Sequence, residues 1–183
     1  MSRIHSITIR EAMSNEFDEL GQMMIDVYSQ LEDFPSMDEQ PDYYKMLANI
    51  GDFTKKPDTK LLVAISPESK ILGGVVYFGD MKYYGSGGTA TKVINASGIR
   101  LLAVDPNTRG MGVGKALTLA CIQNARDRNQ SEVILHTTKA MEIAWGMYEK
   151  MGFKRSPDLD FKQEQLAVYG FRLKLDETSD RIA

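Results

Sequence analysis

The chain has 183 residues, 43% hydrophobic and 26% charged, a composition typical of a soluble globular protein with its own core. A net charge of −3 gives no general attraction to nucleic acid or acidic membranes, so we expect neither as a partner. One cysteine, Cys121, excludes an internal disulfide and argues against a thiolate metal site, and we expect no metal. No signal peptide and no membrane span is evident, which makes the cytoplasm the expected location.

Hydrophobic periodicity predicts the elements in chain order. Strands are expected at 7–10, 61–65, 72–78, 98–104, 133–136 and 166–175, and helices at 17–27, 43–50, 113–126 and 140–151. Residues 83–96 contain a glycine run and are predicted to form a flexible loop or hairpin tip. The order β-α-α-β-β-β-α-β-α-β-β indicates a mixed, three-layer α/β fold. We expect one domain over 1–175 and a polar tail over 176–183.

A glycine-rich step lies between the strand at 98–104 and the helix at 113–126. It reads Arg-Gly-Met-Gly-Val-Gly-Lys over residues 109–115. Free N–H groups at a helix start bind phosphates, and glycines let that backbone come close to them. A P-loop would need a glycine at Arg109 and a serine or threonine after Lys115, and both are missing. A dinucleotide fingerprint would need its third glycine at 115, whereas the chain has it at Gly114.

The spacing that fits is Arg-x-x-Gly-x-Gly, formed by Arg109, Gly112 and Gly114. About 30 residues downstream comes a second motif, Ala-x-x-x-Tyr-x-x-x-Gly-Phe. Its residues are Ala144, Tyr148, Gly152 and Phe153. Together with the segment 102–114, these two motifs in this order resemble the GNAT family of N-acetyltransferases. The resemblance rests on residues 98–153, whereas the N-terminal half agrees with the family in element order only.

The resemblance implies that acetyl-CoA is the acyl donor and that its pyrophosphate lies on the helix start. The residues expected to bind it are Arg109, Gly110, Met111, Gly112, Val113, Gly114 and Lys115. In the family this loop acts mainly through its backbone. The side chains of Arg109 and Lys115 either reach a phosphate or remain solvated.

In the family, the pantetheine arm pairs with the strand that ends in the first motif, here Leu102, Ala103 and Val104. That strand is bulged and splays from its neighbour, which leaves an N–H free to stabilise an oxyanion. The amide of Leu102 or Val104 is our expectation for this role. Ala144 and Tyr148 of the second motif are expected near the cofactor, with Tyr148 as the general acid that protonates the departing thiolate. Core packing is the alternative for Tyr148.

Two positions depart from the family pattern. Met141 stands where many relatives have an asparagine that contacts the pantetheine arm. Gly98 is the nearest position to an acid that many relatives carry early on the motif strand, so the expected general base is missing. Glu32 and Asp33, in the loop between the first two helices, either supply the base, because that loop usually borders the acceptor site, or are solvated loop acids.

Three further residues are candidates for the acceptor site. Tyr83 and Tyr84, beside the glycine run, either cover the acceptor or are exposed loop aromatics. His136 either touches the acceptor or packs as a structural histidine.

The predicted function is therefore acetyl transfer from acetyl-CoA to a primary amine of a small molecule or peptide by direct attack. A covalent cysteine route is disfavoured because Cys121 lies on a core stripe of its helix. The alternatives are an acyl-CoA-binding sensor without turnover and a dinucleotide-dependent oxidoreductase, which the glycine spacing disfavours. Homodimers are common in the family, so the resemblance allows a homodimer. The identity of the amine cannot be read from the sequence.

Overall fold

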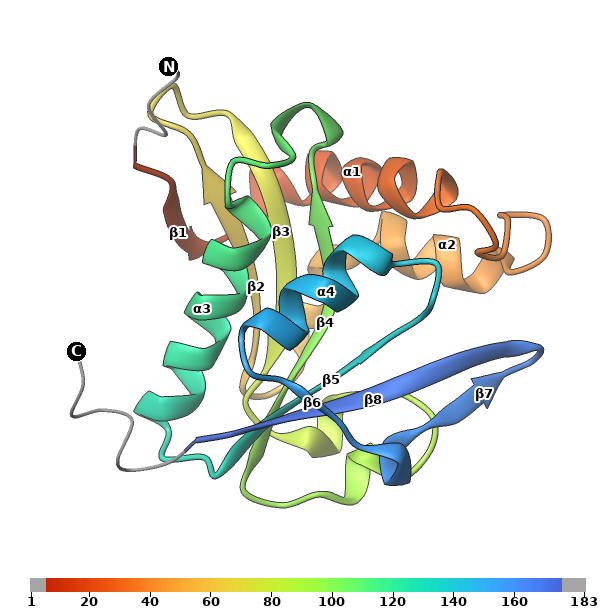
Figure 1. Ribbon diagram of the computed structural model, residues 1–183. Coiled ribbons are helices and arrows are strands. Elements are labelled where there is room, and N and C mark those ends of the chain that lie inside the picture. The colour runs from red at the N-terminus through yellow and green to blue at the C-terminus, as the bar shows by residue number, and fades with distance from the viewer. Residues whose placement is uncertain (1–5, 176–183) are drawn as a thin grey trace. The chain divides into compact units, whose positions relative to one another are not determined.

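The computed structural model describes residues 6–175, so the expected polar tail lies outside the described residues (Figure 1). The main helices are α1 (Phe17–Ser29), α2 (Pro41–Ala48), α3 (Val113–Asp127) and α4 (Glu142–Lys150). The strands are β1 (Thr8–Glu11), β2 (Thr59–Ile65), β3 (Ile71–Phe78), β4 (Ala96–Val104), β5 (Glu132–Thr137), β6 (Lys154–Arg155), β7 (Phe161–Gln163) and β8 (Leu166–Lys174). The mixed α/β class is confirmed. Three strands follow α4, whereas the expected element order had two and placed only one of them, at 166–175.

The described strands form a mixed sheet in the order β1-β2-β3-β4-β5-β8-β6, with β7 paired to β8. β1 runs antiparallel to β2, β4 runs parallel to β5, and β5 runs antiparallel to β8. The chain forms two compact units. The N-terminal unit contains residues 6–76 and 101–120, and the C-terminal unit contains 77–100 and 121–175. β3, β4 and α3 each continue from one unit into the other.

Two adjacent glycines of β3 determine how helices pack in the N-terminal unit. A Cβ on Gly74 would lie 2.9 Å from the Leu20 side chain of α1, whereas one on Gly73 would lie 2.7 Å from the Ala103 carbonyl oxygen and 3.1 Å from Val113 of α3. Successive side chains of a strand point to opposite faces. Helix α1 therefore covers one face of β3 and the start of α3 covers the other.

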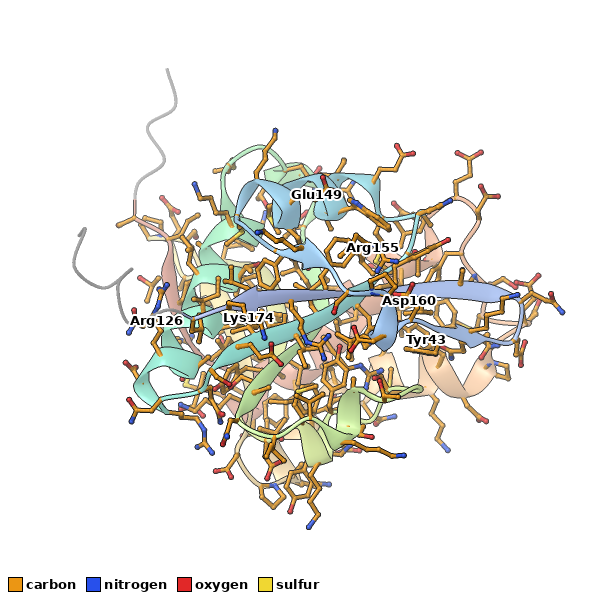
Figure 2. All side chains as sticks on the ribbon, turned by 60° about the horizontal axis from the view of Figure 1, so that its bottom comes forward. Tyr43, Arg126, Glu149, Arg155, Asp160 and Lys174 are labelled. Carbon is orange, nitrogen blue, oxygen red and sulfur yellow. The ribbon has the colours of Figure 1, made fainter. Side chains whose placement is uncertain are left out.

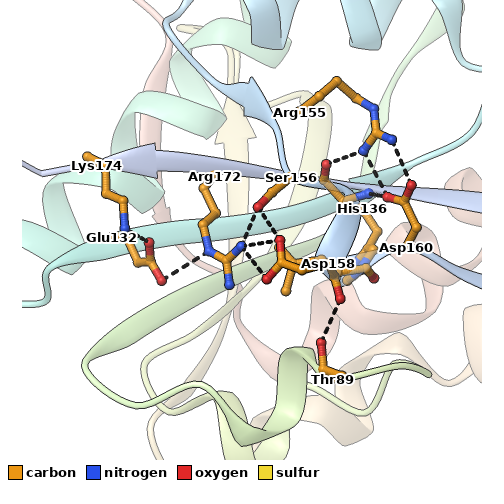
Figure 3. A network of polar contacts seen from close by, with 11 residues as sticks. Thr89, Glu132, His136, Arg155, Ser156, Asp158, Asp160, Arg172 and Lys174 are labelled. Atoms are coloured by element: carbon orange, nitrogen blue, oxygen red, sulfur yellow. Dashed lines mark hydrogen bonds and ion pairs between the residues drawn. The ribbon is translucent and has the colours of Figure 1, made fainter.

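In the C-terminal unit, aromatic rings and ion pairs hold α4 and the last strands together. The Trp145 ring of α4 meets the Phe171 ring of β8 edge to face, with 4.9 Å between centroids. Arg155 of β6 forms a bidentate ion pair with Asp160 at 2.7 and 2.8 Å, and the two side chains are neighbours in Figure 2. A second network links Glu132 of β5 to Arg172 and Lys174 of β8 (Figure 3).

The segment 83–96, expected as a flexible loop or hairpin tip, is a loop with little regular structure. It begins at the last residue of the short 3-10 helix η3 (Met81–Tyr83) and contains η4 (Ala90–Lys92). The hydroxyl of Thr89 donates to the carbonyl of Asp158 at 2.9 Å (Figure 3). A Cβ on Gly87 would lie 2.7 Å from the ring of Phe161. The glycines therefore allow this segment to pack closely on the C-terminal strands, whereas we took them as a sign of mobility.

Candidate active site

The loop between β4 and α3 is tightly ordered by its own backbone. It opens with the 3-10 helix η5 (Pro106–Thr108), whose N-cap Asp105 accepts a hydrogen bond from the Asn107 amide at 2.9 Å. Gly110 and Gly112 follow with φ of +83° and +82°. Only glycine adopts this left-handed conformation without strain. The two glycines thus redirect the chain into α3, which begins at Val113 as predicted.

The start of α3 has the features of an anion site. Its first helical hydrogen bond runs from the Ala116 amide to the Gly112 carbonyl at 3.0 Å. The N–H groups of residues 112–115 therefore precede the intrahelical ladder, at the positive end of the helix dipole. A Cβ at Gly110 or Gly112 would meet no atom within 4 Å, so the space beside this backbone is open. Free N–H groups beside open space give this helix start the features of a site that can bind an anion.

A bulge interrupts β4 just before this loop. Leu101 has a φ of +59° although it is a bulky, 93% buried residue in a strand. β4 pairs with β5 only as far as Ile99, which is opposite Leu135. Beyond that point β5 pairs with β8 alone, through His136 and Thr137. The two central strands therefore stop pairing at the bulge, as the resemblance implied for this strand.

The segment of β4 after the bulge has one edge that does not face β3. The Asp105 amide donates to the Leu72 carbonyl of β3 at 2.9 Å. Because backbone groups alternate between the two edges of a strand, those of Leu102 and Val104 point away from β3. The Leu102 carbonyl accepts a hydrogen bond from the Tyr28 hydroxyl at 3.1 Å. The amides that we expected to contact the thioester belong to this second edge.

Tyr148 lies on α4 in the C-terminal unit and is 5% exposed. Its ring meets that of Phe153 edge to face, with the centroids 5.7 Å apart. Burial raises the pKa of the Tyr148 phenol well above its usual value, and interactions with Cys121 and Tyr84 raise it further. The phenol is therefore protonated at neutral pH. Ala144 lies one helical turn before it and is partly buried.

The absence of an acid at Gly98 has a structural explanation. A Cβ on Gly98 would lie 2.5 Å from the ring of Tyr84 and 2.8 Å from the sulfur of Met81. Tyr84 has no exposed surface, so it is neither an exposed loop aromatic nor an exposed cover for an acceptor. Its ring fills the space that a side chain at position 98 would need.

Tyr84 and His136 form a hydrogen-bonded pair whose proton positions follow from their partners. His136 Nε2 lies 2.8 Å from the carbonyl oxygen of Leu159, and a carbonyl only accepts, so Nε2 carries the proton. In the neutral ring Nδ1 is then the acceptor, and the Tyr84 hydroxyl donates to it at 2.8 Å. Burial lowers the pKa of His136, which favours this neutral form.

The other predicted acceptor and loop residues are distributed over both units. Glu32 and Asp33 are exposed in the loop after α1, Tyr83 is partly buried in η3, and Arg109, Met111 and Lys115 are exposed. Met141 is the N-cap of α4 and makes no side-chain capping bond.

Sequence reasoning missed two residues at this site. Leu101 gave no signal, because leucine is not a residue that favours a positive φ. Tyr28 lies one residue beyond the helix expected at 17–27, and only the fold reveals that its hydroxyl reaches Leu102.

Two surveys of the described residues bear on other classes of function. No group of three or more histidine, cysteine or acidic side chains in 6–175 is placed to hold a metal ion. No helix within that range is both long and apolar enough to cross a bilayer.

The fold and the loop define a mixed-sheet α/β protein with a glycine-rich helix start after a bulged strand. The model of the acetyltransferase (GNAT) family matches residues 24–153, well over half of the chain. The chain therefore belongs to the GNAT acetyltransferase family.

Individual relatives agree with this assignment. Human N-acetyltransferase 8B is 44% identical over 55 residues, which cover 30% of this chain and 24% of that protein. The chain thus matches about a quarter of the length of this relative. An acetyltransferase of the GNAT family from Staphylococcus aureus Mu50 has a TM-score of 0.70 at 20% identity, covering 93% of this chain and 100% of that one. The PaiA N-acetyltransferase of Thermoplasma acidophilum, solved with coenzyme A, gives 0.69 at 16% identity with the same coverage. At these identities the two structures show the fold alone.

Proposed function

We propose that this protein transfers the acetyl group of acetyl-CoA to a primary amine of a small molecule or peptide. The observation that carries the proposal lies within the N-terminal unit. There, one stretch of chain runs from the left-handed bulge at Leu101, along an edge that turns away from β3, to the helix start at Gly112. That order of features suits a thioester beside the strand and a diphosphate at the helix.

Acetyl-CoA would supply a thioester carbonyl that the amine nitrogen attacks. The N–C bond forms and the C–S bond breaks, while nitrogen loses one proton and sulfur gains one. The amide of Leu102 or Val104 donates to the carbonyl oxygen, where negative charge develops. The N–H groups of residues 112–115 hold the diphosphate, and Arg109 and Lys115 add positive charge nearby.

Tyr148 is our candidate for the group that donates a proton to the sulfur. Its raised pKa keeps the phenol protonated, which a donor to a departing thiolate requires. Replacing Tyr148 by Phe keeps the packing on Phe153 and removes only the hydroxyl. We expect this variant to release CoA thiol about 100-fold more slowly, with the acetyl-CoA dissociation constant unchanged within about twofold. Unchanged release would remove Tyr148 from the reaction.

The ligand is tested first, by thermal shift with acetyl-CoA, CoA and NAD. Stabilisation by acetyl-CoA and CoA but not by NAD is the expected result. The reverse pattern would contradict the proposal and favour the oxidoreductase. CoA-thiol release with a panel of primary amines then tests turnover.

An acyl-CoA sensor without turnover is the second candidate. The packing of Tyr84 over Gly98, where many relatives have an acid, favours it, as does Met141 at the N-cap of α4. A sensor would bind acetyl-CoA and release no thiol with any amine of the panel.

A further inference from the structure

Three aromatic side chains gather where the loop after α1 meets α2. The rings of Tyr28 and Phe34 have centroids 5.6 Å apart, those of Phe34 and Tyr43 are 5.7 Å apart, and those of Tyr28 and Tyr43 are 6.2 Å apart. We call these three residues the aromatic cluster. Tyr28 is buried, whereas Phe34 and Tyr43 are partly exposed, and Figure 2 labels Tyr43. The cluster thus keeps part of its aromatic surface accessible.

The aromatic cluster is attached to the bulged strand. The Tyr28 hydroxyl donates to the Leu102 carbonyl, one residue beyond the left-handed Leu101. The loop that carries Phe34 is fixed as well, because the Tyr44 hydroxyl donates to the Pro35 carbonyl at 2.7 Å. All these residues belong to the N-terminal unit. The aromatic surface is therefore held beside the strand at which we place the thioester.

The chain segment that carries the aromatic cluster is acidic, and Lys45 on α2 is the basic residue that follows it directly. Between Ala12 and Tyr44 the chain has no lysine or arginine and nine acids: Glu16, Asp18, Glu19, Asp26, Glu32, Asp33, Asp38, Glu39 and Asp42. The whole chain has 25 acidic and 22 basic residues, so the remainder has 16 acids and 22 bases. The net charge of −3 thus combines −9 in this segment with +6 elsewhere.

Several of these acids remain available to a ligand in solution. Glu16 is paired with Arg10 at 2.8 Å, and Glu39 accepts from the Ser36 amide at 2.9 Å. Glu32, Asp33, Asp38 and Asp42 are exposed in the chain segment that carries the aromatic cluster. Exposed carboxylates of this kind favour a cationic ligand over an anionic one.

We propose that the acceptor is a linear amine with a second positive charge. One amino group would lie at the open edge of β4, its alkyl chain would lie on Phe34 and Tyr43, and its second ammonium would face the carboxylates of the loop. Aromatic faces attract ammonium groups. The carboxylates of the loop repel an acceptor that carries a carboxylate of its own. This inference rests on the proposed acetyl transfer and names the substrate class of the same site.

Three probes of equal chain length test the charge preference directly. They are 1,5-diaminopentane, pentylamine and 5-aminopentanoate, whose far ends are cationic, neutral and anionic. We expect kcat/KM for acetylation to fall in that order, with about tenfold between successive probes. Titration calorimetry in the presence of CoA should rank their binding in the same way. The preference for the diamine should shrink as salt is raised, because exposed charges are screened.

Variants of the loop after α1 separate an effect of its charge on the choice of acceptor from a direct effect on acetyl transfer. Glu32→Gln combined with Asp33→Asn should lower kcat/KM for the diamine about fivefold and leave pentylamine nearly unchanged. Asparagine tolerates the φ of +62° at position 33, so the loop should keep its path. Glu68→Gln removes one exposed charge from the turn after β2 and serves as the matched control, with no expected change. Tyr43→Leu should weaken both amines about two- to fivefold through the lost aromatic face.

The outcomes distinguish this inference from the proposed function. If acetyl-CoA does not bind, or no amine releases thiol, acetyl transfer itself is refuted. If thiol is released but 5-aminopentanoate equals or exceeds the diamine, acetyl transfer stands and the dication is wrong. An equal loss for all three probes in the Glu32/Asp33 variant would also overturn it, because those acids would then act on the amine proton. Faster turnover of an N-acetylated lysyl-lysine amide than of the diamine would assign the surface to peptides instead.

Discussion

At the scale of single residues, Gly98 has the clearest structural requirement near the site. Its hydrogen is the only substituent that leaves room for the Tyr84 ring. The hydroxyl of Tyr84 in turn donates a hydrogen bond to Nδ1 of His136. Gly98, which stands where many relatives have an acid, thus has a packing role. The pair Tyr84–His136 occupies the volume that a side chain at 98 would otherwise fill.

Gly98→Ala should therefore destabilise the protein. The new Cβ would lie 2.5 Å from the Tyr84 ring, and overpacking of this kind costs about 1–3 kcal/mol. Urea denaturation of the variant should show this loss in the free energy of unfolding. Gly146→Ala on α4 is the matched control, because its Cβ would meet no atom within 4 Å and alanine favours a helix by up to about 1 kcal/mol. Equal effects at the two positions would refute the packing role.

At the scale of elements, the β4–α3 loop depends on backbone conformation more than on side-chain charge. Gly112 has a left-handed φ, and the space where a Cβ would point is open. Substitution at this position therefore acts through strain and through the path of the loop. Lys115 is exposed, and its ammonium is one of two cations beside the helix start.

We expect Gly112→Ala to weaken acetyl-CoA binding at least about tenfold, since a non-glycine residue in this conformation costs about 1–2 kcal/mol and the loop relaxes away from it. Lys115→Ala should weaken binding less, because the backbone N–H groups remain. Calorimetric titration of both variants with acetyl-CoA measures the difference. A greater loss in Lys115→Ala would show that charge, and not the backbone, holds the diphosphate.

Local elements were the part of this fold that the sequence predicted well. The start of α3 at Val113 follows from a glycine step and helical spacing, and the strands expected at 61–65 and 72–78 lie within β2 and β3. The contact between Tyr84 and His136 joins residues 52 apart in the chain, and no local pattern reports such a distance. The same holds for Tyr28 and Leu102, which are 74 apart. Local propensity predicts the elements, whereas their side-chain partners depend on how the sheet brings distant segments together.

At the scale of the whole molecule, acid should weaken the fold in two stages. Burial lowers the pKa of His136, so the folded state favours its neutral form. This stabilisation is present above the unfolded pKa of about 6.5 and is lost as pH falls below it. Hydrogen bonds from Arg172, Arg155 and Arg10 lower the pKa values of Asp158, Asp160 and Glu16, whose stabilisation is lost only below about pH 4.

Thermal melts from pH 8 to pH 3 should show both stages. His136→Gln should flatten the decline between about pH 7 and 5 and leave the steeper loss near pH 4 in place. A wild-type melting temperature that is constant down to pH 5 would contradict the burial of a neutral His136.

The two glycines in β3 also affect the ligand loop. Gly73 and Gly74 have only hydrogen atoms where α3 and α1 approach the strand. The absence of side chains at these positions lets both helices pack close to β3. The helix that rests on Gly73 is α3, whose first turn follows the β4–α3 loop. A single methyl group at Gly73 would push against the Ala103 carbonyl and against Val113, and so shift the bulged strand and the helix start together. Under the proposed function, Gly73 thus controls the distance between the strand beside the thioester and the helix start beside the diphosphate, although no ligand would touch this residue.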